Sequence, residues 1–244
     1  MHNLPGEFNI VKCRSCGLMR TNPRPTPEAI GFFYPDDYGP YLVPVVQLET
    51  NDNESNNFKS FLKPVLNKIF NANSTLIPSL PPGRMLEVGC ASGAYLNHMV
   101  RKGWKVQGIE FSEEVAQVAR DIGHKVHGGP LETAPEPEEP FDLIVGWMVL
   151  EHLHEPILGL RKLYKWANPG AWLALSIPNA DSLDFGLFKD KGYALQVPTH
   201  MYHYTPHSLE KVLEAGGWSI EKIYHQRTLN NYCLLYTSPS PRDS

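Results

Sequence analysis

The sequence predicts an α/β fold built on a doubly wound, mostly parallel sheet, and three observations support this class. Runs rich in apolar residues at 85–88, 104–110 and 141–146 are typical of strands that are buried on both faces. Apolar residues at helical spacing follow the first two runs, beginning at Ala94 and at Glu113. A turn of small residues at 89–93 joins the first strand to its helix. With 244 residues, the chain is long enough to bury the core of such a domain.

The overall composition disfavours several classes of protein. A net charge of −4 and a pI near 6.2 predict no basic surface for nucleic acid. No apolar run approaches the roughly 20 residues of a membrane span, and the first residues lack the pattern of a signal peptide. Four cysteines, only two of them close together, do not predict a disulfide framework. We therefore expect a cytoplasmic protein with neither a nucleic-acid nor a membrane partner.

Residues 1–45 are predicted to form a small knuckle followed by an aromatic segment at 32–38. Cys13 and Cys16 have the spacing of half a zinc site, but a structural site needs four ligands and the sequence holds no second Cys-x-x-Cys pair. We interpret the pair as a zinc-free knuckle. Thr26 and Pro27 predict the start of a helix. Residues 46–83 are predicted to contain a helix at 58–70 and a linker.

The turn after the first strand has the features of a cradle for a nucleotide-type ligand. Its small residues let a ligand approach the backbone, and the amides that open the next helix can bind an acceptor group. The spacing Gly89-x-Ala91-x-Gly93 lacks the G-x-G-x-x-G pattern of dinucleotide sites. Glu87, just before the turn, would repel a pyrophosphate, so a ligand that carries a positive charge suits this site better.

Glu110 ends the second predicted strand, about 20 residues beyond the glycine turn. A carboxylate at this spacing can accept both hydroxyls of a bound ribose. The alternative is an ordinary solvated surface glutamate. Phe111 follows directly and is placed to lie against an adenine face.

Two motifs carry a resemblance to the class I S-adenosylmethionine-dependent methyltransferases. In that family an acidic residue precedes spaced glycines, as Glu87 does here, and Ala91 is a mild departure because a methyl group still leaves the turn compact. The run 141–156 resembles the F-D-x-I…V-L-E-H-L-x-x-P motif of the same family. Because the chain also has an N-terminal C-x-x-C-G knuckle, it most resembles the methyltransferase-23-like group within this family. The resemblance covers most of residues 13–224 and implies a Rossmann-like sheet and S-adenosylmethionine as cofactor.

The resemblance also implies which residues contact the cofactor. Relatives hold the adenine edge near the position of Leu131, and the fourth strand leads into the same crevice through Trp147 and Met148. The expected cofactor-binding residues are Glu87, Gly89, Cys90, Ala91, Gly93, Glu110, Phe111, Leu131, Trp147 and Met148.

The resemblance bears on the N-terminal segment as well. In similar bacterial methyltransferases a C-x-x-C-G element is preceded by a second C-x-x-C, which here would lie before Met1. We therefore expect zinc at Cys13 and Cys16 only if such an upstream half-site exists. The aromatic segment at 32–38 packs near the site as a lid in relatives; the alternative is a plain aromatic cluster.

The remaining elements follow in order within a methyltransferase domain of residues 84–232. We predict strands at 125–127, 171–177 and 218–224, helices at 157–167 and 208–217, and a turn at 168–170. Thr205 and Pro206 start the second of these helices. The irregular segment 181–204 is interpreted as a cover that binds the acceptor.

The end of the chain, residues 233–244, is interpreted as a non-native tail. The run from Cys233 to Asp243 resembles the translation of a transposase-type sequencing adapter, so natural sequence is expected to stop near Tyr232, as in a metagenomic fragment. A native tail rich in serine and proline is the alternative. We accordingly expect the last strand of the family's sheet to be missing, which would leave an unpaired edge.

Methyl transfer from a sulfonium is a direct displacement, so the main task of the protein is to hold the acceptor in line. A hydroxyl acceptor also calls for a base, and histidine has a suitable pKa. His152 is the first candidate, and His200 and His203 follow; each has a structural role as the alternative.

We expect a methyltransferase that acts on a small molecule such as a sugar or secondary metabolite, with its oligomeric state left open. One rival interpretation is a metal-dependent enzyme that uses His152, His154, His200 and His203. Another is a module that binds the nucleoside without catalysis.

Overall fold

The computed structural model describes residues 6–34, 77–188, 195–225 and 232–239. The helix predicted at 58–70 and its linker up to residue 76 lie outside the described residues.

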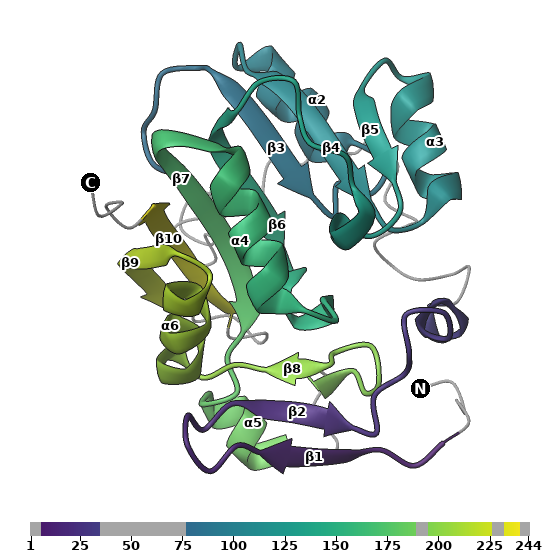
Figure 1. Ribbon diagram of the computed structural model, residues 1–244, viewed down its shortest axis with the longest axis vertical. Coiled ribbons are helices and arrows are strands. Elements are labelled where there is room, and N and C mark those ends of the chain that lie inside the picture. The colour runs from purple at the N-terminus through teal and green to yellow at the C-terminus, as the bar shows by residue number, and fades with distance from the viewer. Residues whose placement is uncertain (1–5, 35–76, 189–194, 226–231, 240–244) are drawn as a thin grey trace, which may run out of the picture.

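A seven-stranded sheet forms the centre of the protein, in the order β5-β4-β3-β6-β7-β10-β9 (Figure 1). The first five strands of this order pair in parallel, whereas β10 runs antiparallel to both of its neighbours. The strands are β3 (Arg84–Val88), β4 (Lys105–Glu110), β5 (Lys125–Gly128), β6 (Phe141–Trp147), β7 (Ala167–Pro178), β9 (Trp218–His225) and β10 (Tyr232–Pro239). The predicted doubly wound, mostly parallel sheet is confirmed.

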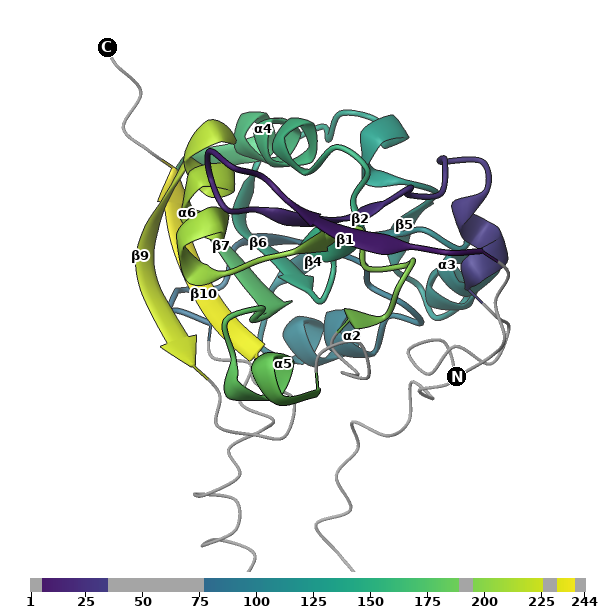
Figure 2. The ribbon, with the colours of Figure 1, turned by 90° about the horizontal axis from the view of Figure 1, so that it is seen from below.

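Helices cover both faces of the sheet because the side chains of the strands alternate between two cores. On one face Met85 packs in a cluster with Leu96 of α2, and on the other Leu86 packs in a cluster with Leu160 of α4. Figure 2 shows α4 and α6 on one side of the sheet and α2 on the other. The helices around the sheet are α2 (Ala94–Arg101), α3 (Glu113–Asp121), α4 (Pro156–Trp166) and α6 (Pro206–Ala215).

Two helices begin at side-chain caps. The Ser112 hydroxyl accepts a hydrogen bond from the Val115 amide at the start of α3, at 3.3 Å. Thr205 and Ser208 form a reciprocal capping box at the start of α6, where Pro206 occupies the first turn. These caps satisfy amides that have no partner within the helix, and they confirm both predicted helix starts.

A second, three-stranded sheet of order β1-β2-β8 joins the N-terminal segment to residues 202–203. It contains β1 (Asn9–Lys12), β2 (Met19–Asn22) and β8 (Tyr202–His203), and α5 (Leu183–Phe188) precedes its last strand. In Figure 1 this sheet lies beyond the carboxyl ends of β6 and β7. The N-terminal segment is therefore built into the end of the domain where ligands bind in open α/β sheets.

Two local predictions are wrong. Instead of a helix from Thr26, a turn leads into a short 3-10 helix, η1 (Ile30–Phe33), and Tyr34 is already extended. Pro35 follows Tyr34, and a residue before proline avoids the helical region. The turn predicted at 168–170 is instead part of β7, where a register shift against β6 accommodates the extra residues.

The expectation of a missing last strand is also wrong. β10 lies between β7 and β9, paired from Tyr232↔Pro178 to Thr237↔Leu173 on one side and from Cys233↔His225 to Pro239↔Trp218 on the other. Both neighbouring strands present backbone groups that need partners, and the tail contains β-branched and aromatic residues that favour a strand. Residues 232–239 thus form the last strand of the sheet, between β7 and β9. The non-native origin of residues 233–244 stays a prediction.

Candidate active site

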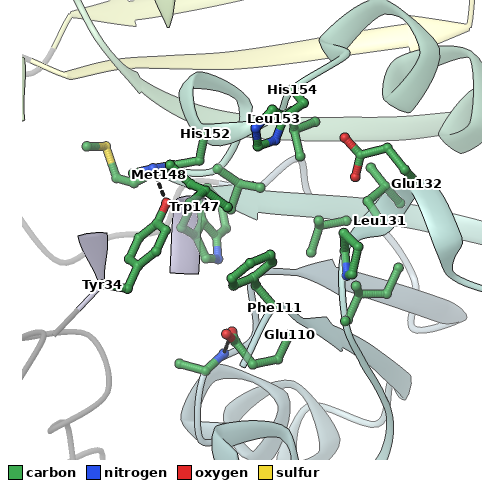
Figure 3. Close-up of a pocket in the computed structure, with 18 residues that line it drawn as sticks. Tyr34, Glu110, Phe111, Leu131, Glu132, Trp147, Met148, His152, Leu153 and His154 are labelled. Carbon is green, nitrogen blue, oxygen red and sulfur yellow. Dashed lines mark hydrogen bonds between the residues drawn. The ribbon is translucent and has the colours of Figure 1, made fainter. Parts of the chain in front are cut away.

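A cavity opens where β3, β4 and β6 end, and residues from the N-terminal segment close one side of it (Figure 3). Its wall includes the turn after β3, the ends of β4 and β6, and two short 3-10 helices, η4 (Leu131–Thr133) and η5 (Leu150–His152). Ile30 and Tyr34 complete the wall. The cavity therefore occupies the position in which open α/β sheets bind ligands.

The turn after β3 is held in a shape that only small residues adopt easily. Gly89, Ala91 and Gly93 have φ angles of 72°, 46° and 84°. A side chain on Gly89 would place its Cβ 2.6 Å from Cγ2 of Val149. Because the backbone is bare here, Gly89 and Ala91 form part of the cavity wall and leave room for a ligand.

Glu110 fixes the turn from the end of β4. Its Oε2 accepts a hydrogen bond from the Ala91 amide at 2.9 Å, and its Oε1 accepts one from the Ser112 amide at 3.0 Å. Only 5% of the residue is exposed, so the alternative of a solvated surface glutamate is wrong. Burial raises the pKa of this carboxyl, and the amide hydrogen bonds oppose the rise. A carboxylate on the cavity wall with ordered oxygens is well suited to a ribose.

Glu87 is a second acid beneath the turn. It is 3% exposed, and its Oε2 has no hydrogen-bond partner. Burial, and then the nearby charge of Glu110, raise its pKa well above the usual range. Glu87 does not line the cavity, so it would act on a bound ligand through its charge from beneath the turn. A positively charged ligand would offset the repulsion between the two carboxyls. The two acids and the bare turn therefore fit a cationic nucleoside such as S-adenosylmethionine.

Four more of the predicted contact residues line the cavity. Phe111 is 42% exposed beside Glu110, and Leu131 is buried at the start of η4. Trp147 and Met148 follow β6, and the indole Nε1 of Trp147 is buried without a hydrogen-bond partner. Their cofactor contacts stay predictions, but their side chains surround the same space (Figure 3).

Cys90 and Gly93 have structural roles in the turn and do not line the cavity. The Cys90 thiol is buried against Gly108, where an added Cβ would meet Sγ at 2.5 Å, and its amide donates to the Ile109 carbonyl. Gly93 caps α2 with a left-handed backbone. Burial raises the pKa of the Cys90 thiol far above its ordinary value. We therefore expect this thiol to be unreactive.

His152 is the candidate base that lines the cavity. Its Nδ1 lies 2.9 Å from the Thr199 carbonyl and 2.8 Å from the Tyr34 hydroxyl. A carbonyl only accepts, so Nδ1 carries the proton and Nε2 carries the lone pair. Burial lowers the pKa of His152 to about 4, so the ring is neutral at physiological pH. Figure 3 shows the hydrogen bond between Nδ1 and the Tyr34 hydroxyl, whose oxygen is the acceptor because Nδ1 carries the proton. Tyr34 belongs to the aromatic segment predicted as a lid.

The other two candidate bases are not on the cavity wall. His203 is 4% exposed, and its Nε2 pairs with the Thr21 hydroxyl at 3.2 Å, which ties β8 to β2. His200 is 1% exposed and packs edge-to-face against His152, with ring centroids 4.6 Å apart. Of the three candidates, His152 is the one that lines the cavity, and its role as a base stays a prediction.

The four predicted histidine ligands do not converge, so that rival metal site is wrong. The Nε2 atom of His154 lies 3.1 Å from the Pro25 carbonyl, and His203 is held by Thr21. Within the described ranges, the group with the spacing of a metal site consists instead of Glu151, His152 and His200. Sequence reasoning missed Glu151, although an acid beside His152 in a strand-end motif is a recognisable signal.

The Cys-x-x-Cys pair lies in the turn between β1 and β2. Cys13 is exposed and Cys16 is partly buried, and both are free thiols. Hydrogen bonds from neighbouring amides lower the pKa of Cys13. Among the residues that the structure describes, no other ligand gathers around the pair, so zinc at this knuckle stays a prediction that depends on an upstream half-site.

Arg24 anchors the N-terminal segment against the site. Its guanidinium donates to the Tyr202 hydroxyl at 2.6 Å and to the His154 carbonyl at 2.8 Å, and it pairs with Glu155 at 3.2 Å. These contacts join the segment 22–25 to the residues that follow η5 and to β8. They hold the segment that carries Tyr34 beside the cavity.

No helix in the described part of the chain is long and apolar enough to cross a membrane.

Comparisons with known proteins agree with this geometry. A family model described as a methyltransferase domain, Methyltransf_23, matches residues 58–223. A ubiquinone biosynthesis O-methyltransferase from Bordetella bronchiseptica is 32% identical over 136 residues, which cover 51% of this chain and 56% of the relative. The first matches among curated relatives each span about half to two thirds of the relative's length.

Solved structures show the same fold. The magnesium protoporphyrin IX methyltransferase of Synechocystis PCC 6803, with bound S-adenosylhomocysteine, has a TM-score of 0.56 at 18% identity, covering 86% of this chain and 97% of that one. An S-adenosylmethionine-dependent methyltransferase from Mesorhizobium loti has a TM-score of 0.55 at 18% identity, covering 72% and 97%.

Proposed function

We propose that this chain, which belongs to the Methyltransf_23 family of class I S-adenosylmethionine-dependent methyltransferases, moves a methyl group to a hydroxyl oxygen of a small-molecule acceptor. The observation that carries this proposal is that a single cavity is lined both by groups suited to the cofactor and by a histidine suited to the acceptor. Glu110 and the bare turn lie on one part of it, and the neutral imidazole of His152 lies on another.

The cofactor part of the wall has the chemistry that S-adenosylmethionine needs. Glu110 would accept the ribose hydroxyls, and Phe111 and Leu131 would contact the adenine. The Glu87 carboxyl lies behind the wall, where a nearby cationic ligand would favour its charged form. When bound, the cofactor supplies a methyl group on a positively charged sulfur, which leaves as a neutral thioether after the displacement. The protein's own task is to hold the acceptor in line with that methyl group.

His152 is the residue that we propose acts on the acceptor hydroxyl. The Thr199 carbonyl fixes the ring through Nδ1, which leaves the lone pair of Nε2 for the acceptor side. The Tyr34 hydroxyl adds a second contact to Nδ1. As the acceptor oxygen bonds to the methyl carbon, its proton must leave, and a neutral imidazole on the wall assists that departure.

The acceptor is expected to be a small molecule that carries a hydroxyl group. Curated relatives are ubiquinone biosynthesis O-methyltransferases, which favours phenolic hydroxyls, and sugars or other secondary metabolites remain within the proposal. The apolar side chains of Leu131, Trp147 and Met148 around the cavity suit a ring-shaped acceptor.

The test is a transfer assay on the full chain with S-adenosylmethionine and a panel of phenols, catechols and sugars, in which S-adenosylhomocysteine and methylated product are both quantified. We expect product with at least one phenolic acceptor. His152→Ala should lower turnover by roughly 10²–10⁴-fold while it leaves S-adenosylhomocysteine binding intact. His207→Ala, at an exposed histidine on α6, is the matched control and should change neither.

Binding of S-adenosylhomocysteine without product from any acceptor would contradict the proposal and favour a nucleoside-binding module. Equal turnover by His152→Ala and the wild-type chain would contradict the role of His152.

A further inference from the structure

We propose that Glu151, His152 and His200 form a binding site for a divalent transition-metal ion such as Zn²⁺, beside the cavity. One ligand atom from each of the three residues lies within 4.8 Å of the others, and the set contains two imidazoles and one carboxylate. Histidine and carboxylate are ordinary ligands of Zn²⁺. The proposal rests on the proposed function for its catalytic consequence, but the binding of the ion does not.

The carboxyl of Glu151 is the observation that points to a ligand. The residue is 1% exposed, and neither of its carboxyl oxygens has a hydrogen-bond partner. A buried polar group without a partner costs about 1–3 kcal/mol, and an isolated buried carboxylate costs more. A divalent ion supplies the missing partner for the oxygens.

Backbone contacts hold the three side chains together. Glu151 and His152 belong to η5, whereas His200 comes from the segment just before β8. The Met201 amide donates to the Glu151 carbonyl at 2.8 Å, which ties the two segments beside the cluster. The ligands are therefore fixed by the fold even though the two segments are far apart in the sequence.

The surroundings of His152 match those of a metal ligand. A metal-bound histidine usually donates its other ring N–H to a carbonyl or carboxylate. The Nδ1 of His152 meets the Thr199 carbonyl at 2.9 Å, so Nε2 is the nitrogen with an available lone pair. His200 packs against the same ring at a centroid distance of 4.6 Å, which brings a second imidazole to the cluster.

The number of ligands indicates what the ion would do. Structural zinc sites have four protein ligands, whereas catalytic zinc sites have three and keep a further position for water or substrate. Since His152 lines the cavity, an ion at this cluster lies next to the space for the acceptor. With the ion bound, the Nε2 lone pair of His152 is a metal ligand, so the ion replaces the imidazole as the group that acts on the acceptor hydroxyl. The acceptor class that follows is one whose hydroxyl oxygen coordinates the ion, above all a catechol with two adjacent oxygens, because coordination lowers the pKa of a hydroxyl.

The experiment is a metal titration of the untagged full chain. Because Cys13 and Cys16 could bind zinc themselves, it is done in a Cys13→Ser/Cys16→Ser background, after treatment with a chelator and dialysis. Zn²⁺ binding is followed by calorimetry and Co²⁺ binding by its visible absorption. We expect one ion per chain, with no sulfur-to-cobalt charge-transfer band because the three ligands contain no thiolate.

Matched variants test the ligands. Glu151→Gln keeps the shape of the side chain and removes its charge, and we expect it to weaken Zn²⁺ affinity by at least about 100-fold, as does His200→Gln. Glu210→Gln, at an exposed glutamate on α6, should leave the affinity unchanged. Thermal unfolding of each variant shows that it is folded. The inference is overturned if the folded wild-type chain takes up no ion, or if Glu151→Gln binds Zn²⁺ as tightly as the wild type.

Two further measurements separate this inference from the proposed function. If no ion binds but S-adenosylhomocysteine binds and methyl transfer proceeds in a chelator, the metal site is refuted and the methyltransferase stands. If the ion binds in a Glu151-dependent way but no acceptor is methylated, the metal site stands and the proposed function is refuted.

Discussion

Substituting Gly89 by alanine tests the shape of the turn that we assign to the cofactor. Gly89 has a φ angle of 72°, and an L-residue pays about 1–2 kcal/mol for this left-handed conformation. The new Cβ would also lie 2.6 Å from Cγ2 of Val149, and such overpacking costs about 1–3 kcal/mol. We therefore expect Gly89→Ala to lower the free energy of unfolding by about 2–5 kcal/mol, which corresponds to a fall in Tm of roughly 4–20 °C.

A double-mutant cycle with Val149→Ala separates the two costs, because the second substitution removes the methyl group that clashes. We expect the double variant to be less destabilised than the sum of the single variants by about 1–3 kcal/mol, the overpacking part alone. The assay is chemical denaturation followed by fluorescence, with S-adenosylhomocysteine affinity measured on each folded variant. A Gly89→Ala chain as stable as the wild type, or strictly additive effects, would refute the described turn.

Three further predictions concern the segments around the cavity. Tyr34→Phe removes the hydroxyl beside Nδ1 of His152 and should lower turnover about 2–10-fold at unchanged S-adenosylhomocysteine affinity, as steady-state kinetics would show. Burial lowers the pKa of His203 from 6.5 to about 4. The folded protein therefore resists protonation of this ring, and its free energy of unfolding should fall by up to about 3 kcal/mol as the pH drops from 6.5 to 4. Chemical denaturation over this pH range should show a shallower pH dependence for His203→Gln than for the wild type. Thr205→Ala removes the cap of α6 and should cost about 1 kcal/mol by the same assay, with Thr133→Ala, at an exposed threonine in η4, as its control.

The sequence was sufficient to predict the elements that depend on local patterns. The parallel strands have continuous apolar runs, and Ser112 and Thr205 have the residue types that cap helices. Glu110 could be identified because the spacing between a glycine turn and the acid that faces it is fixed by one strand-helix-strand unit.

The contacts that could not be predicted are those between distant parts of the chain. The small sheet pairs Arg20 with Tyr202, and no local pattern in either two-residue stretch indicates that partner. We did not predict β10 because residues 233–244 were interpreted as a non-native tail, outside the fold. Its pairing depends instead on the backbone groups that β7 and β9 leave available at their edges.

The histidines show the same limit. The sequence ranks His152 ahead of His200 and His203, but only tertiary packing places His152 on the cavity wall and His203 against Thr21. The convergence of Glu151 with His200 likewise depends on the backbone contact between η5 and the segment before β8.

The most direct test of the central claim is calorimetric titration of S-adenosylmethionine and S-adenosylhomocysteine into the full chain, beside a Glu110→Ala variant and a Glu132→Ala control. Because Glu132 lines the same cavity, a Glu210→Ala variant, at an exposed glutamate on α6 that does not line it, serves as the second control. We predict saturable binding of both ligands to the wild type and to the Glu210→Ala control, and a loss of at least tenfold in Glu110→Ala, since a hydrogen bond to a charged group contributes about 1.5–3 kcal/mol. Absence of binding to folded wild-type protein, or equal affinity in Glu110→Ala, would contradict the account.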